Sequence, residues 1–207
     1  MPQGQIDVGG SVSNVMVGSV KLYVAPSGTT LPNVDGTYPI VWPVGWVGVG
    51  YTDKGVDFSY SPSVKDITVD EELAPVMFVL SAEKGEITAV LAESTLANLN
   101  KAISASTLTG PTVADLTHGV FSTLEFGSGT LTEVMIGFEG FAPPDTGSTL
   151  YPAVLVAYRA MAQGAVKLNF QRTEKQMYQC TWSLLADSTQ AVGKRLVKYI
   201  QITAPHS

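Results

Sequence analysis

The chain has a single cysteine, Cys180, and two histidines among its 207 residues. One cysteine excludes an intramolecular disulfide framework and is compatible with assembly in a reducing cytoplasm. The zinc-binding spacings Cys-x-x-Cys and His-Glu-x-x-His are absent as well. A chain of this length buries about 70% of its unfolded surface without such staples. We therefore expect one domain over residues 1–207, held together by its own core.

Arrangements of residues that carry out catalysis are also missing. The two histidines are His118, in a loop, and His206, beside the C-terminus, and neither has the oriented nucleophile that a general base needs. The glycines of residues 45–50 are spaced wrongly for a nucleotide-binding turn. Asp70-Glu71-Glu72 lacks the ligand alternation and central glycine of a calcium loop. The sequence thus predicts no catalytic residue, no cofactor, no metal site and no enzyme activity.

Charged residues and long apolar runs are both scarce. Only 14% of the residues are charged, against about a quarter in a typical soluble domain, while 45% are hydrophobic. No apolar stretch reaches the ~18 residues of a membrane span. The N-terminus also lacks the basic segment and apolar core of a secretory signal. We expect no membrane association and a surface that neighbouring molecules partly cover.

The charges that are present are segregated along the chain. Residues 51–93 contain nine acids and three lysines, and their net charge of −6 equals that of the whole chain. Residues 159–207 contain seven bases and two acids, a net charge of +5. One reading is ordinary solvated strand faces; the other is head-to-tail self-association of acidic and basic parts. The candidates for a basic inter-subunit surface are Arg159, Lys167, Arg172 and Lys175.

Most of the chain alternates apolar and polar residues with a period of two, which predicts β-strands. Residues 165–172 and 177–184 each read as a half-buried strand, and Val134, Ile136 and Phe138 mark another. The continuous apolar run 153–158 is typical of a strand covered on both faces. We expect C-terminal strands over residues 120–203 and a mainly β fold of two packed antiparallel sheets.

The acidic segment 51–93 reads as two consecutive hairpins. In the first, Val56, Phe58 and Tyr60 pair with Ile67 and Val69 across a Ser61-Pro62-Ser63 turn. The second turns at residues 81–85. This phasing places one acid-rich polar face on both hairpins, with Asp57, Asp66, Asp70 and Glu86.

One helix and two irregular segments complete the prediction. Residues 94–104 form the helix, with Ser94 or Thr95 as its N-cap and Leu96, Leu99 and Ile103 as its apolar stripe. A stripe this short must dock on a sheet. Residues 1–10 read as an N-terminal arm, and residues 25–44, with four prolines, as a long loop.

The order of acidic hairpins, Leu91-Ala92-Glu93-Ser94-Thr95-Leu96 and short helix resembles the major tail tube proteins of long-tailed bacteriophages. The match covers residues 45–104, and the rest of the chain only in layout. The resemblance implies a β-sandwich or barrel with a flanking helix, whose copies form hexameric rings that stack into a hollow tube. It also implies that hairpins from all copies join into an inner barrel with an electronegative lumen.

The resemblance further implies roles for particular residues and partners. Asp57, Asp66, Asp70 and Glu86 would line the lumen, through which double-stranded DNA passes without specific binding. The 25–44 loop would contact the next ring through Tyr38 and Trp42, although these aromatics would equally cover the subunit's own core. The implied partners are further copies of the chain and the tape measure, tail terminator and distal tail proteins. The implied location is the virion tail, assembled in the host bacterial cytoplasm.

Two alternatives remain open at this point. A monomeric β-sandwich would bind a ligand such as a carbohydrate on a platform of Trp42, Trp46 and Tyr51. The chain would otherwise be a different virion component, such as a tail terminator or a capsid decoration protein. Direct readout of DNA is disfavoured by the sequence pI of about 4.8, because affinity for duplex DNA comes mainly from Lys and Arg.

Overall fold

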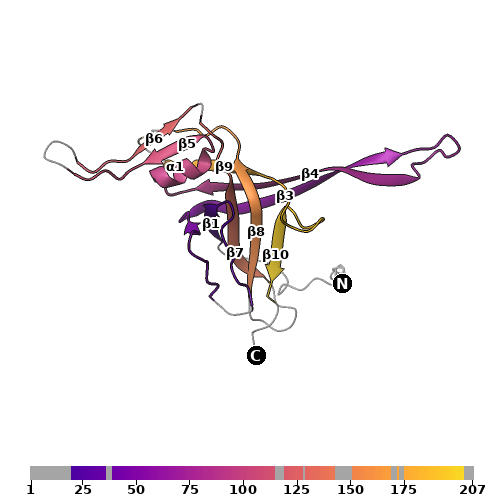
Figure 1. Cartoon of the computed structure of the whole chain (residues 1–207), viewed down its shortest axis with the longest axis horizontal. Helices are drawn as coiled ribbons and strands as arrows, with labels where there is room; N and C mark the ends of the chain where they lie inside the picture. Colours follow the sequence, from indigo (N-terminus) through magenta and orange to yellow (C-terminus); the bar gives the residue numbers. More distant parts are fainter. Residues whose placement is uncertain are drawn as a thin grey trace, which may run out of the picture.

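The fold of the chain is mainly β in a computed structural model that describes residues 20–35, 39–114, 119–127, 129–142, 151–168, 172 and 175–202 (Figure 1). All strand pairs are antiparallel and the one helix of the described residues is short, as predicted. The elements are β1 (Lys21–Pro26), β2 (Val47–Gly48), β3 (Thr52–Ile67), β4 (Met77–Leu91), α1 (Leu96–Ala102), β5 (Ser106–Thr109), β6 (Thr123–Phe126), β7 (Val134–Ala142), β8 (Tyr151–Ala162), β9 (Tyr178–Leu184) and β10 (Val197–Gln201).

The main sheet has the strand order β2-β1-β7-β8-β9-β4-β3, and β10 also pairs with β8. The pairing of β8 changes along its length: Ala153 to Ala157 pair with β10, whereas Ala160 to Ala162 pair with β9. The sheet therefore divides at β8 and encloses a core, consistent with the predicted β-sandwich. In Figure 1 the β3–β4 pair crosses the direction of β7, β8 and β10 steeply. β5 and β6 form a separate hairpin.

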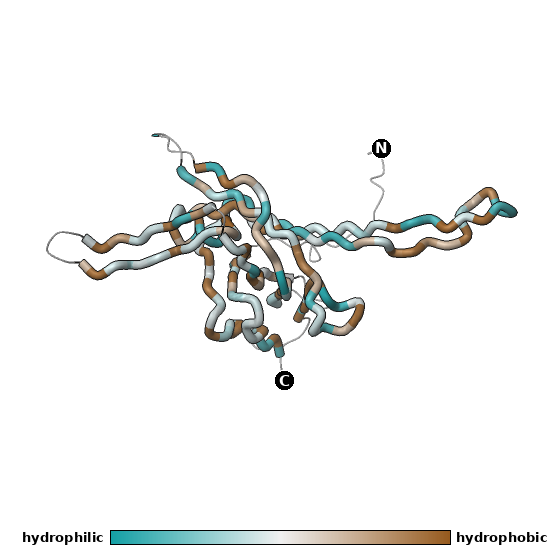
Figure 2. Tube along the Cα trace, turned by 45° about the horizontal axis from the view of Figure 1, so that its top comes forward, coloured by the Kyte–Doolittle hydropathy of each residue, from teal (hydrophilic) through white to brown (hydrophobic). Residues whose placement is uncertain are grey.

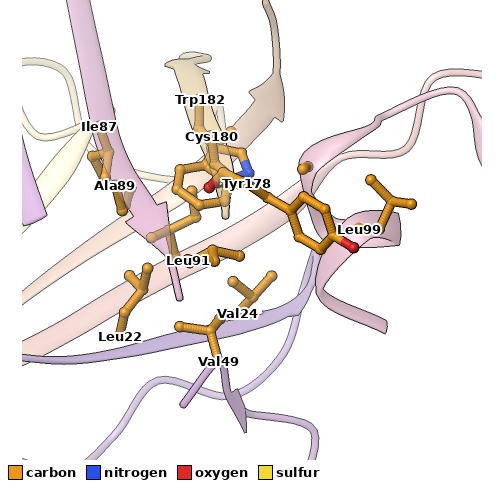
Figure 3. Close-up of a cluster of buried hydrophobic side chains, with 14 of the residues drawn as sticks. Leu22, Val24, Val49, Ile87, Ala89, Leu91, Leu99, Tyr178, Cys180 and Trp182 are labelled. Atoms are coloured by element: carbon orange, nitrogen blue, oxygen red, sulfur yellow. Dashed lines mark hydrogen bonds between the residues drawn. The ribbon is translucent and has the colours of Figure 1, made fainter. Parts of the chain in front are cut away.

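The main core lies between the layers (Figure 3). Trp182, Ile87 and Leu91 are completely buried, and Leu22 and Ile136 face them from β1 and β7. On β9 the buried residues are Tyr178, Cys180 and Trp182, which confirms the predicted alternation of residues 177–184.

A second cluster covers the other face of β7 and β8. Trp46 and Ile40 of the loop after β1 pack on Met135, Val154 and Val156. The run 153–158 is therefore buried on both faces, as its lack of alternation predicted. The loop belongs to the body of the protein, because its apolar residues complete this second cluster.

The helix docks where it was predicted, although it is shorter than residues 94–104. Thr95 is the N-cap, and its Oγ1 accepts a hydrogen bond from the Asn98 amide at 3.1 Å. The buried Asn98 side chain donates to the carbonyls of Val49 and Glu93 at 2.8 and 3.0 Å. Leu99 and Ala102 complete the contact with the main core. The cap and the buried amide together fix where the helix starts and which face it buries.

The predicted pair of hairpins is wrong, because β3 and β4 form one long hairpin. Their register runs from Thr52↔Leu91 to Ile67↔Met77, and the chain reverses over residues 68–76. Proline is tolerated in an edge strand, and β3 lies at the end of the strand order, so Pro62 does not stop it. Gly85 serves packing and not a turn: a Cβ there would lie 2.8 Å from Leu184 Cδ1.

The predicted strand 165–172 is also wrong over its described part, since residues 165–168 and Arg172 are not in a strand. The expected partner, β9, pairs instead with β4 along Tyr178 to Ser183 and with β8 at Trp182 to Leu184. Residues 169–171, 173 and 174 lie outside the described residues, as does the predicted N-terminal arm of residues 1–10.

Candidate self-association surface

The distal part of the β3–β4 hairpin stands away from the body of the protein (Figure 1). Every residue from 59 to 84 is exposed, whereas β4 becomes alternately buried as soon as it meets β9. We call residues 59–84 the arm. A two-stranded hairpin with no third strand or helix against it is marginally stable in water.

Hydrophobic residues lie along both strands of the arm (Figure 2), and their side chains are exposed. The four consecutive residues 77–80 are all apolar and exposed, and strand alternation sends Met77 and Val79 to one face and Phe78 and Leu80 to the other. The exposed set is Val64, Ile67, Val69, Leu73, Val76, Met77, Phe78, Val79 and Leu80. Exposed apolar surface of this extent is typical of a binding interface.

The four acidic residues proposed for the lumen do not share one face, contrary to the phasing of two hairpins. Asp57 and Glu86 do share a face at the root of the arm, because Asp57 pairs with Thr88 and Ser59 with Glu86. The register shifts between Ser63 and Val64, where Ser81 of β4 is the extra residue. β3 itself keeps its alternation, so Asp66, nine residues after Asp57, points to the opposite face. Asp70 lies in the turn.

The end of the arm is acidic. Asp66, Asp70, Glu71 and Glu72 fall within seven residues that are all exposed, and Lys65 is the adjacent base. Leu73 follows them and is fully exposed. The turn closes through the Val76 amide, which donates to the Ile67 carbonyl at 2.9 Å. We call residues 66–73 the tip: four carboxylates beside one exposed leucine.

Two of the four predicted basic residues make ion pairs within the chain. Arg159 donates from Nε and Nη2 to the two carboxylate oxygens of Glu133 at 2.9 and 2.8 Å, which lowers the pKa of Glu133. Lys175 Nζ lies 2.8 Å from Asp53 Oδ1, and this hydrogen bond lowers the pKa of Asp53. Lys167 and Arg172 are exposed. Arg159 and Lys175 thus have a role in the single subunit.

A groove of about 680 Å³ lies at the root of the arm, beside the connection from β9 to β10. Apolar walls come from Phe58 on β3, from Leu184 at the end of β9, and from Leu185, Val192 and Leu196 of that connection. Lys194 and Arg195 also line it. These two bases belong to the basic C-terminal segment of residues 159–207, and no pattern in the sequence distinguishes them from its other bases.

Trp42 contacts the core of its own subunit, the second of the two roles considered for it. Its ring stacks on Tyr23 at 4.3 Å between centroids, and its Nε1 donates to Glu139 Oε2 at 2.8 Å. Trp46 is buried, with Nε1 donating to the Thr30 carbonyl at 2.9 Å, while Tyr51 is 80% exposed. These three residues therefore form no exposed stacking platform. Tyr38 lies outside the described residues.

The described residues contain no group of three His, Cys, Asp or Glu side chains that could hold a metal ion. His118 lies outside them. Burial raises the pKa of the Cys180 thiol to about 12, so this thiol stays protonated and unreactive near neutral pH. Within the part of the chain that the structure describes, no helix has the length and apolar character needed to cross a membrane.

Comparison of the chain with protein-family models and with curated proteins found no match.

Proposed function

We propose that this chain is the structural subunit of a phage-type tail tube, which self-assembles into stacked hexameric rings around a channel for DNA. The observation that carries the proposal is the arm, a hairpin that is exposed throughout and apolar on both faces. The sequence resemblance to major tail tube proteins supplies the kind of assembly. The proposed location is the virion tail, assembled in the host bacterial cytoplasm.

The arm supports self-association because a second copy would remove two liabilities at once. Its apolar faces would be buried, and the free edge of β3 would gain a partner strand. Closing hairpins from several copies into one barrel abolishes their edges altogether. The tip of the arm is acidic, whereas residues 159–207 of the body carry a net charge of +5. Opposite charges on two different surfaces favour a head-to-tail arrangement, which closes into rings.

The acidic residues support a channel that repels DNA. Asp57 and Glu86 share a face near the root of the arm and are our first candidates for the lumen wall. Asp66, on the opposite face, and Asp70, in the turn, are candidates for subunit contacts instead. A narrow bore lined with carboxylates focuses a negative potential, so that DNA slides through without binding. Tape measure, tail terminator and distal tail proteins are the further partners that this function would require.

Negative-stain electron microscopy of the purified full chain tests the proposal. We expect rings or tubes with a central channel, accompanied by a concentration-dependent increase in mass in light scattering. A species that stays monomeric at high concentration and across a range of salt concentrations would contradict the proposal. Assemblies of a different shape, such as single caps or flat lattices, would favour a terminator or decoration protein.

A further inference from the structure

The groove at the root of the arm joins an apolar floor to a basic rim. Phe58, Leu184 and Leu185 supply apolar wall, while Lys194 and Arg195 lie on the same connection as the exposed Val192. Glu83 also lines the groove, but its carboxylate accepts a hydrogen bond from the Tyr60 hydroxyl. Lys194 and Arg195 carry two positive charges against the one negative charge of Glu83, so the groove has a net positive charge.

The connection that forms the outer wall is closed on itself by hydrogen bonds. The Asp187 amide donates to the Arg195 carbonyl at 2.9 Å, and the Lys194 amide donates to the Ala191 carbonyl at 3.0 Å. The Asp187 carboxylate accepts hydrogen bonds from Thr189 at 2.8 Å and Gln190 at 3.2 Å. These bonds hold the wall in place before any partner arrives, which reduces the entropic cost of binding.

The tip has the complementary features, a fully exposed Leu73 that directly follows Asp70, Glu71 and Glu72. It cannot enter the groove of its own chain. The groove contacts β3 at Phe58 and Tyr60, and Ile67 lies seven residues farther along the extended strand, roughly 23 Å away at 3.3 Å per residue. A tip that occupies the groove therefore belongs to a second copy.

We infer that the tip of one copy docks in the groove of the next, with Leu73 against the apolar wall and Glu71 and Glu72 beside Lys194 and Arg195. Such a contact joins two different surfaces, so it repeats head-to-tail from copy to copy. The inference rests on the proposed self-assembly and specifies which surfaces meet.

Charge reversal with rescue tests the contact. K194E/R195E and E71K/E72K should each raise the concentration for half-maximal assembly by about tenfold or more, because two attractive pairs become repulsive. Combining all four substitutions should restore assembly to near the wild-type concentration, since opposite charges face each other again. The control K21E/K54E removes two exposed bases away from the groove and should leave the assembly concentration unchanged.

Disulfide trapping gives a second readout. In a mixture of L73C and V192C, oxidation should give a covalent dimer that contains one chain of each kind. Neither variant oxidised alone should give a covalent dimer in comparable yield. The buried Cys180 should not interfere.

The inference and the proposed function fail in different ways. Rings or tubes that form normally, but show neither charge-reversal rescue nor the mixed disulfide, would overturn the docking inference and assign the groove to another occupant. A wild-type chain that forms no assembly would overturn both.

Discussion

Gly137 shows how one missing side chain organises the face of β7 that the loop covers. A Cβ at this position would lie 2.4 Å from Trp42 Cη2 and 3.0 Å from Trp46 Cζ3. The absent methyl group lets the Trp42 indole lie flat, stack on Tyr23 and reach Glu139. The buried Glu139 thereby gains a donor for its carboxylate, which would otherwise be costly to bury.

Replacing Gly137 with alanine should lower the free energy of unfolding by about 1–3 kcal/mol, because the indole must move out of its place. Denaturant unfolding followed by tryptophan fluorescence measures this loss, with a red shift of the native emission. The control Gly140→Ala lies in the same strand, where a Cβ would meet only Val20 Cγ2 at 3.6 Å. Equal destabilisation by the two substitutions would contradict the steric argument.

At the scale of elements, strands with buried side chains were predictable from the sequence, whereas the pairing of the exposed strands was not. The alternation of Tyr178, Cys180 and Trp182 and the unbroken apolar run of β8 both follow from burial, so they identified β9 and β8 correctly. The arm has no buried face, so its alternation carried no information on register. Pro62 and Gly85 were therefore interpreted as turn residues. In the structure Pro62 is tolerated because β3 is an edge strand, and Gly85 leaves room for the side chain of Leu184.

The candidate site was predictable in part for the same reason. The acidic charge of residues 51–93 was evident from composition, but which acids share a face depended on the register. The groove was not predictable, because it joins Phe58 to Leu184 and Lys194, residues more than 120 positions apart in sequence.

Shortening the arm should separate folding from assembly. Replacing residues 62–83 with Asn-Gly leaves the pair Ser61↔Lys84 closed by a two-residue turn that suits a hairpin. The melting temperature of the body should stay within about 5 °C of the wild type, since no buried residue is removed. Sedimentation analysis should show a monomer at concentrations where the wild type assembles; a tube built by the shortened chain would contradict the role of the arm.

At the scale of the whole molecule, charge decides whether an assembled channel ignores DNA. The variant D57K/E86K reverses the two acids that share a face near the root of the arm. Tubes of this variant should retain duplex DNA in a co-sedimentation assay at low salt and release it as salt rises, because phosphate contacts release counterions. Wild-type tubes should retain none.

The control D66K/D70K changes the net charge equally but places the new lysines at the tip. Any tubes that this variant forms should therefore retain DNA only at about the wild-type level. Retention that is equal for both variants would mean that net charge, and not position in the channel, governs DNA binding.

The attachment of the arm to the body has a mechanical consequence. β4 continues from the arm into the body and pairs there with β9 from Glu86↔Ser183 to Leu91↔Tyr178. Hydrogen bonds between antiparallel strands run perpendicular to the strands. A pull along the arm therefore loads this whole ladder in shear, so that its bonds resist together and do not open one after another. A subunit held by its arm would transmit tension into its core through β9 and on to β8, before the hairpin peels away.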